Sequence, residues 1–233
     1  MKLSIVLAGF IVMGLLVPTT SSSSVLSQQS TPDDGNKLVY ADFEKIENGR
    51  AVSNSGGLIQ IFTGQESTPV KYKGSASVPG APELVRLPQS ATNHLAAFDY
   101  TLIGPNQWAN VTLEIQGKPS SNGQPAADDV SAFKNLSFQL YATGIESVRV
   151  EVISHGQGIK LDAGFPQMAI RLKPGLNTYL VPLNKLAQPA WQQQHVDTKE
   201  VLKKLTAVSI SAFCSQCTPQ NGQIIIDNVV FQK

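Results

Sequence analysis

Near its carboxyl end this 233-residue chain reads Gly-Gln-Ile-Ile-Ile-Asp-Asn-Val-Val-Phe, from Gly222 to Phe231. The apolar run predicts a buried closing strand, which a single carboxylate, Asp227, interrupts. A buried carboxylate needs a hydrogen-bond partner, a metal ion or water to stay charged. Near the other end, Leu38 to Glu44 predicts an opening strand that also ends in carboxylates. We therefore expect the first and last strands to meet, with their carboxylates around a hard cation.

The amino terminus has the pattern of a secretory signal peptide. Lys2 precedes an apolar run from Leu3 to Val17, which is shorter than the roughly 18 to 20 residues of a membrane span. We predict a signal peptide over 1–22, a disordered leader rich in Ser, Gln and Thr over 23–36, and one domain over 37–233. The protein is expected to be secreted, periplasmic or extracellular, and to touch a membrane only through an uncleaved signal.

The charges of the chain give no indication of a nucleic-acid partner. Its 18 Lys and Arg residues nearly balance 17 Asp and Glu residues, and the two signs are interspersed. A nucleic-acid-binding domain would concentrate basic residues on one face. We therefore exclude nucleic acid as a partner.

Period-two alternation dominates the domain. Apolar residues alternate with polar ones in four segments, 111–116, 136–141, 148–153 and 208–213. Each segment predicts a strand with one core face and one solvated face, and together they favour two antiparallel sheets packed face to face. One helix is expected from Thr198 to Lys204, because Asp197 and Glu200 have the spacing of a capping box.

Short motifs in this order carry a family resemblance. They are an opening Asp42-Phe43-Glu44, Trp108 before a strand, Asp129-Val130-Ser131 before a central strand, Asn177 to Leu183, a loop with Pro189-Ala190-Trp191, and a closing Ile226-Asp227-Asn228-Val229. This order resembles the galactose-binding-like jelly roll of carbohydrate-binding modules, especially the family 11 type found with cellulases and related extracellular enzymes. The resemblance implies an all-β fold, an antiparallel jelly-roll β-sandwich, with one short helix.

The resemblance also implies a structural calcium ion. Its protein ligands would be Glu44 and Asp227, with Asp42 as a weaker candidate and backbone carbonyls completing the shell. Calcium takes six to eight oxygens, and two carboxylates from distant strands would tie the ends of the sandwich together. The alternative is that Asp227 only caps backbone amides in a turn and that Glu44 is solvated.

A sugar site needs flat aromatic faces and a few planar hydrogen-bonding groups in a groove. We expect 136–141 and 148–153 to form a hairpin whose outward face gathers Gln139, Tyr141, Arg149 and Glu151, with Glu114 on a neighbouring strand. The alternative is an ordinary solvated sheet face with an Arg149–Glu151 pair.

Each of the two tryptophans has its own expected place. Trp191 lies in a loop that contains proline, where an indole either stacks on a ligand or plugs the end of the core. Trp108 opens a strand and is expected in the core.

Cys214 and Cys217 form a Cys-Ser-Gln-Cys unit between the last two strands. No second cysteine pair suggests a zinc ribbon, and no βαβ pattern suggests a redox motif. In an oxidising compartment we predict a loop disulfide.

Signals of catalysis are missing from the sequence. The three histidines stand apart from any nucleophile pattern, and no phosphate-binding loop or nucleophile elbow occurs.

The predicted function is a secreted, non-catalytic carbohydrate-binding module for a polysaccharide or glycan, with a structural calcium, acting alone or with an extracellular enzyme or envelope protein in trans. The alternative is a cell-envelope or extracellular jelly roll for protein interaction or assembly, such as the related intermediate-associated protein 30 domain.

Overall fold

The computed structural model describes residues 35–64, 70–88, 92–114, 126–214 and 219–233. The longest strand in this part of the chain is β14 (Gln220–Gln232), which contains the apolar stretch near the carboxyl end. Its alternate residues Ile224 and Ile226 are fully buried, as a strand with one core face requires. This strand pairs on one side with β9 (Asn135–Ala142) and on the other with β7 (His94–Leu102) along its first part and β1 (Lys37–Ala41) along its last.

The strand β14 lies at the centre of a seven-stranded antiparallel sheet. The order in this sheet is β12-β9-β14-β7-β5, with β1 added beside β14 and β6 beside β7. The remaining strands are β5 (Lys71–Lys73), β6 (Glu83–Arg86) and β12 (Asn177–Pro182). The expectation that the first and last strands meet is therefore confirmed, since Leu38 pairs with Phe231.

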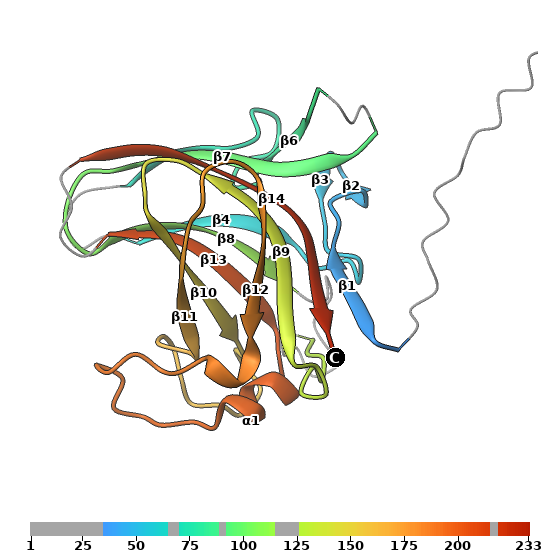
Figure 1. Ribbon diagram of the computed structural model, residues 1–233, viewed down its shortest axis with the longest axis vertical. Helices are drawn as coiled ribbons and strands as arrows, with labels where there is room; N and C mark the ends of the chain where they lie inside the picture. Colours follow the sequence, from blue (N-terminus) through green and yellow to red (C-terminus); the bar gives the residue numbers. More distant parts are fainter. Residues whose placement is uncertain (1–34, 65–69, 89–91, 115–125, 215–218) are drawn as a thin grey trace, which may run out of the picture. The chain divides into compact units, whose positions relative to one another are not determined.

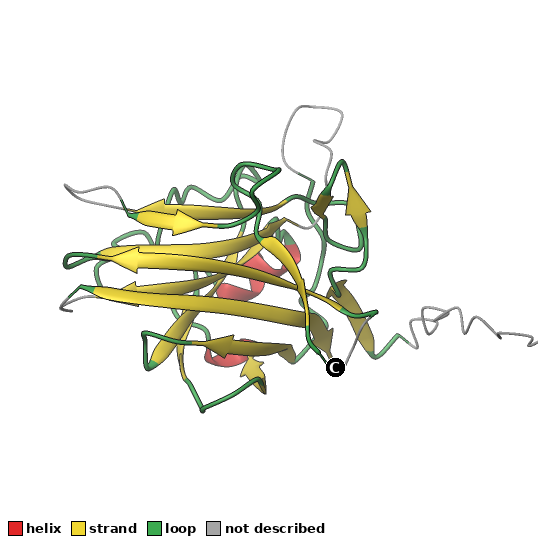
Figure 2. Ribbon diagram, turned by 90° about the horizontal axis from the view of Figure 1, so that it is seen from above, coloured by secondary structure: helices red, strands yellow, loops and turns green. Residues whose placement is uncertain are grey.

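A second antiparallel sheet has five strands in the order β11-β10-β13-β8-β4. They are β4 (Ile59–Gly64), β8 (Gln107–Glu114), β10 (Ser147–Ile153), β11 (Gln167–Arg171) and β13 (Ala207–Cys214). A small ladder of β2 (Ile46–Glu47) and β3 (Arg50–Ala51) stands apart. Figure 1 shows the two larger sheets as facing layers, and Figure 2 shows strands of the seven-stranded sheet side by side.

The core lies between the two sheets and consists of aliphatic and aromatic side chains. Val148, Val150 and Val152 of β10 face Leu136, Phe138 and Leu140 of β9 from opposite layers, and all six are buried. This arrangement is an antiparallel β-sandwich of the jelly-roll kind, as the sequence predicts.

The predicted helix is confirmed. The structure has α1 (Thr198–Lys203), and Asp197 accepts a hydrogen bond from the backbone N–H of Lys199 at its start. Val201 and Leu202 bury one side of the helix against the sandwich. The described residues also contain a 3-10 helix, η1 (Leu183–Lys185).

The expected hairpin is wrong. The segments 136–141 and 148–153 belong to β9 and β10, which lie in different sheets. The alternation of each segment was interpreted correctly, but period-two alternation says only that a strand has a buried face. It contains nothing about which strand is its neighbour.

The predicted signal peptide and leader lie outside the described residues, except for the last two leader positions. In the part of the chain that the structure describes, no helix is long and apolar enough to cross a membrane.

Candidate functional site

The candidate site is built on the face of the five-stranded sheet that points away from the core. Strand pairing places its side chains in rows across the sheet. One row joins Arg149 of β10 to Ser211 of β13 and Asn110 of β8. The next row contains Gln167, Glu151, Ser209 and Thr112. A sheet face that is normally solvated thus carries a dense set of hydrogen-bonding groups.

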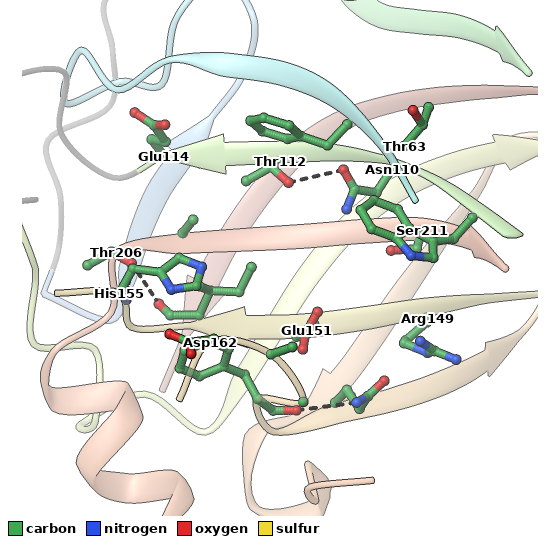
Figure 3. A pocket seen from close by; sticks show the side chains of 18 of the residues that line it. Thr63, Asn110, Thr112, Glu114, Arg149, Glu151, His155, Asp162, Thr206 and Ser211 are labelled. Atoms are coloured by element: carbon green, nitrogen blue, oxygen red, sulfur yellow. Dashed lines mark hydrogen bonds between the residues drawn. The ribbon is translucent and has the colours of Figure 1, made fainter. Parts of the chain in front are cut away.

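A cavity of about 650 Å³ lies over these rows. Figure 3 shows Arg149, Glu151, Ser211 and Asn110 entering it from three adjacent strands. In the middle of the groove the central strand β13 contributes the small side chains of Ala207 and Ser211. The next residue of β13 on this face is Phe213, level with the start of β8. Larger side chains stand on the strands to either side, so the middle of the groove is low.

Arg149 and Glu151 form the charged wall of the groove. The Arg149 guanidinium lies 3.8 Å from the centre of the Phe213 ring, which is a cation–π contact. Burial raises the pKa of Glu151 to about 7, although the charge of Arg149 and a backbone hydrogen bond with Phe165 oppose the rise. Burial also lowers the pKa of Arg149. The two groups therefore lie in a poorly hydrated place, where hydrogen bonds to a ligand are strong.

The opposite wall carries Glu114, the last residue of β8. Burial raises its pKa, while a backbone hydrogen bond with Leu58 and the charge of Arg50 oppose the rise. These neighbours hold Glu114 toward the β4 side of the sheet. It lines the same cavity as Arg149 and Glu151.

Trp191 stands at the rim of the groove with 64% of its surface exposed. Its ring lies against Gly164, where a Cβ atom would come within 2.7 Å of the Trp191 Cη2. The neighbouring Gln192 donates from Nε2 to the carbonyl of Ala163 at 2.7 Å. Such an exposed indole is not a plug of the core, so that interpretation of Trp191 is wrong, and the ligand platform stays a prediction.

Trp108 also lines the groove, from the start of β8. It is partly exposed, and the expectation that it belongs to the core is wrong. Gly64 lies directly opposite it in the β4–β8 pairing, and a Cβ atom at Gly64 would overlap the indole ring. The glycine makes the room that lets the ring lie flat on the sheet.

One end of the groove has a second group of polar residues. The backbone N–H of His155 donates to Thr206 Oγ1 at 3.0 Å, and the imidazole meets the Phe165 ring edge-on, with ring centres 5.0 Å apart. Desolvation lowers the pKa of His155, and the nearby charge of Asp162 opposes that change. Figure 3 shows His155, Asp162 and Thr206 together at this end.

Comparison with solved structures finds this architecture in two structures of family 11 carbohydrate-binding modules from Clostridium thermocellum. One, from a cellulosomal cellulase, matches with a TM-score of 0.51 and 15% identity, over 84% of this chain and 94% of that chain. The other, in complex with a β-1,3-1,4-mixed-linked tetrasaccharide, has a TM-score of 0.52 and 14% identity, over 84% of this chain and 95% of that chain. The fold is that of the family 11 carbohydrate-binding modules. No protein-family model matches the chain, and no curated protein does.

On this family 11 fold, four of the six predicted sugar-binding residues come together. Glu114, Arg149, Glu151 and Trp191 all line one groove. Gln139 and Tyr141 do not join them. They lie on β9, which pairs with β12 and β14 in the seven-stranded sheet. They alternate with buried residues of β9 and so occupy the face away from the core.

The three predicted metal ligands lie close enough to influence one another. Asp227 is buried, and after burial itself the charges of Glu44 and Asp42 raise its pKa further. Its Oδ2 accepts hydrogen bonds from Asn93 Nδ2 at 2.8 Å and from Asn228 Nδ2 at 2.9 Å.

The oxygens of the other two carboxylates are also engaged. Glu44 accepts from the backbone N–H of His94 at 2.5 Å, and its Oε2 lies 2.8 Å from His94 Nδ1. Asp42 contacts the Asn54 side chain and the Glu44 N–H. Within the described ranges, no three histidine, cysteine, aspartate or glutamate side chains are arranged to hold a metal ion. A cation at Glu44 and Asp227 would have to replace some of these hydrogen-bond donors. The calcium site therefore stays a prediction.

The predicted disulfide cannot be placed. Cys217 lies outside the described residues, and Cys214 is described only through its backbone pairing with Gln107.

Several residues of the groove were not predicted from the sequence. The alternation of 208–213 puts Ser211 on a solvated strand face, but nothing in that alternation connects the face to Arg149. The place of Trp108 in the groove could be predicted only together with Gly64, since a glycine opposite a tryptophan makes room for an exposed ring. That combination depends on the register between two strands that lie 44 positions apart in the sequence.

Proposed function

We propose that this protein is a non-catalytic module that binds a polysaccharide in the groove of the five-stranded sheet. The observation that carries the proposal is Trp191, an indole 64% exposed at the rim of a polar cavity. Exposed aromatic rings at a groove are costly in water and are the usual surface on which the apolar face of a sugar packs. The fold shared with carbohydrate-binding modules supports the proposal.

The groove has the polar groups that such recognition needs. Arg149 offers a planar set of donors, Glu151 offers a carboxyl group, and Asn110 offers an amide. Sugar hydroxyls both donate and accept, so a mixture of this kind can pair with several of them at once. Because desolvation already shifts the pKa values of Arg149 and Glu151, we expect these two to contribute most to binding.

The proposal is tested by retention on insoluble polysaccharides and on a glycan array, with the domain from Lys37 onward. The panel includes cellulose, xylan, agarose and mixed-linked β-glucan. We expect selective retention of the parent protein and weaker retention of Arg149→Ala and Trp191→Ala. Tyr141→Ala is the matched control, because Tyr141 lies on the other sheet and should be dispensable.

A folded, monodisperse protein that is retained by nothing in the panel would contradict the proposal. The alternative function, a jelly roll that binds another protein of the envelope or the extracellular space, would then be favoured, and the search would turn to protein partners.

We also propose that a calcium ion binds at Glu44 and Asp227. The support is the mutual repulsion of these carboxylates and Asp42, which a cation would relieve, and the oxygen-rich donor set that calcium prefers. Bound only by the folded state, calcium at about a hundred times its Kd would add about 2.7 kcal/mol of stability. The melting temperature should therefore fall with a chelator and recover with calcium. An unchanged melt, together with no calcium by elemental analysis, would rule the site out.

Secretion is part of the same proposal. It rests on the apolar segment Leu3 to Val17 and the small residues that follow. Amino-terminal sequencing of the mature protein, after expression of the full chain in a host that exports proteins, should find a start close to residue 23. Recovery of the intact chain from the cytoplasm would contradict it.

A further inference from the structure

Both tryptophans of the chain line the groove. They come from different parts of the fold. Trp108 belongs to β8, while Trp191 belongs to the segment between η1 and α1. A protein of this length has room to bury two indoles completely, so two that face the same cavity call for a common explanation.

Each tryptophan ring lies against a glycine. Gly64 pairs directly with Trp108 across β4 and β8, and a Cβ atom there would overlap the ring. At Gly164 a Cβ atom would lie 2.7 Å from the Trp191 Cη2 and 3.1 Å from its Cζ3. Contacts this short are not tolerated, so any other residue at either position would push the indole away. The two glycines therefore set where the two rings lie.

Trp191 is held by its neighbours as well. Gln192 donates to the carbonyl of Ala163 at 2.7 Å, and Gln188 donates to the carbonyl of Gly164 at 3.3 Å. These bonds attach the tryptophan segment to the loop beneath it. A ring that is already in place loses less conformational entropy when a ligand packs on it.

The segments that hold the two rings lie far apart on the sheet. Strands β10 and β13 lie between β8, which carries Trp108, and β11, which follows Gly164, so three strand spacings separate the two places, roughly 14 Å. Across the sheet, Pro166 is level with Val152, Val208 and Leu113. Leu113 lies five residues from Trp108 on β8, which adds roughly 17 Å along the strand direction. The backbone at Trp108 and the loop against which Trp191 lies are therefore on the order of 20 Å apart, beyond the reach of a single sugar ring.

We propose that Trp108 and Trp191 are two separate sugar-stacking subsites at opposite ends of one groove. The ligand is then a glycan segment of several sugar units, which stacks at both ends and forms hydrogen bonds with Arg149, Glu151 and Asn110 between them. A monosaccharide or disaccharide reaches one subsite only. This inference rests on the proposed function, since it assigns the two ends of the same groove.

The chain itself provides the probe, because tryptophan emission reports each subsite. Trp108→Phe leaves Trp191 as the remaining indole, and Trp191→Phe leaves Trp108. Phenylalanine keeps an aromatic face, so both variants should still bind. Each is titrated with cello-oligosaccharides from the disaccharide to the hexasaccharide, and intact polysaccharides of the panel are tested in parallel. We expect the hexasaccharide to change the emission of both variants and the disaccharide to change at most one.

Affinity measurements separate the subsites further. Trp108→Ala and Trp191→Ala should each weaken hexasaccharide binding roughly three- to tenfold, the range expected for one lost aromatic contact. Gly64→Ala should weaken it as Trp108→Ala does, because the new Cβ would displace the Trp108 ring. Tyr72→Ala is the control, an exposed aromatic residue on the other sheet that should change nothing.

A hexasaccharide that binds the parent while one tryptophan stays silent would overturn the inference and leave the proposed function standing. So would a disaccharide that changes the emission of both variants. If the folded parent binds neither the cello-oligosaccharides nor any polysaccharide of the panel, the proposed function and the inference are overturned together.

Discussion

Stability at neutral and alkaline pH should be limited by one groove residue, Glu151. Burial raises the pKa of this carboxyl group to about 7, from an ordinary value of 4.5. The folded state therefore binds the proton more tightly than the unfolded state. This stabilising contribution is complete below about pH 4.5 and is lost as the pH rises through about 7.

The size of the effect follows from the two pKa values. Their difference corresponds to about 3 kcal/mol of folding free energy at most. As the pH rises from about 5.5 to about 8.5, the free energy of unfolding should fall by roughly 2 kcal/mol because of Glu151. Glu151→Gln has nearly the same shape and does not titrate, so it should remove that part of the pH dependence.

The assay is urea unfolding of parent and variant at both pH values. Other groups titrate too, for example Glu114 with its raised pKa and His155 with its lowered one, but they are common to both proteins and cancel in the difference. We expect the parent to lose roughly 2 kcal/mol more than Glu151→Gln on going to high pH. The control Glu83→Gln, at an exposed position on β6, should follow the parent. Equal losses in the parent and in Glu151→Gln would refute the reasoning.

Three further substitutions test the packing, each by urea unfolding. Gly222→Ala should cost about 2 to 3 kcal/mol, because the new Cβ would overlap the Tyr100 hydroxyl and the Thr143 carbonyl, while Gly104→Ala, with only ordinary contacts, should be nearly neutral. Asn93→Ala should cost about 1 to 3 kcal/mol, since the buried carboxylate of Asp227 loses a donor; no loss would mean that water replaces the amide. Trp191→Ala should cost about 0.5 kcal/mol, as expected for an exposed residue, and a loss near 3 kcal/mol would reinstate the interpretation of the indole as a plug.

The fold was largely predictable because period-two alternation is a local property. The segments around Leu136, Val148 and Val208 each needed only their own residues to show a buried face, and each is a strand in the structure. The helix after Asp197 was equally local, since a cap and its first turn lie within four residues. The pairing of β1 with β14 was also expected, because both ends carry carboxylates that interrupt apolar runs.

The site was predictable only in part, because a groove is made by neighbours that are distant in sequence. Arg149, Glu151 and Glu114 were recognisable as polar residues on strand faces, but their common cavity depends on β13 lying between β10 and β8. Gln139 and Tyr141 have the same local pattern and lie on the other sheet, because β9 pairs with β12 and β14.

By itself, the sequence determined which residues face a core and which face solvent, since hydrophobic burial acts on each strand separately. Only the tertiary structure decided which solvated faces adjoin one another. It placed Gly64 against Trp108 and Gly164 against Trp191, and so brought two indoles to one groove. The physical reason is that strand register is set by the packing of whole sheets, and no short segment contains that information.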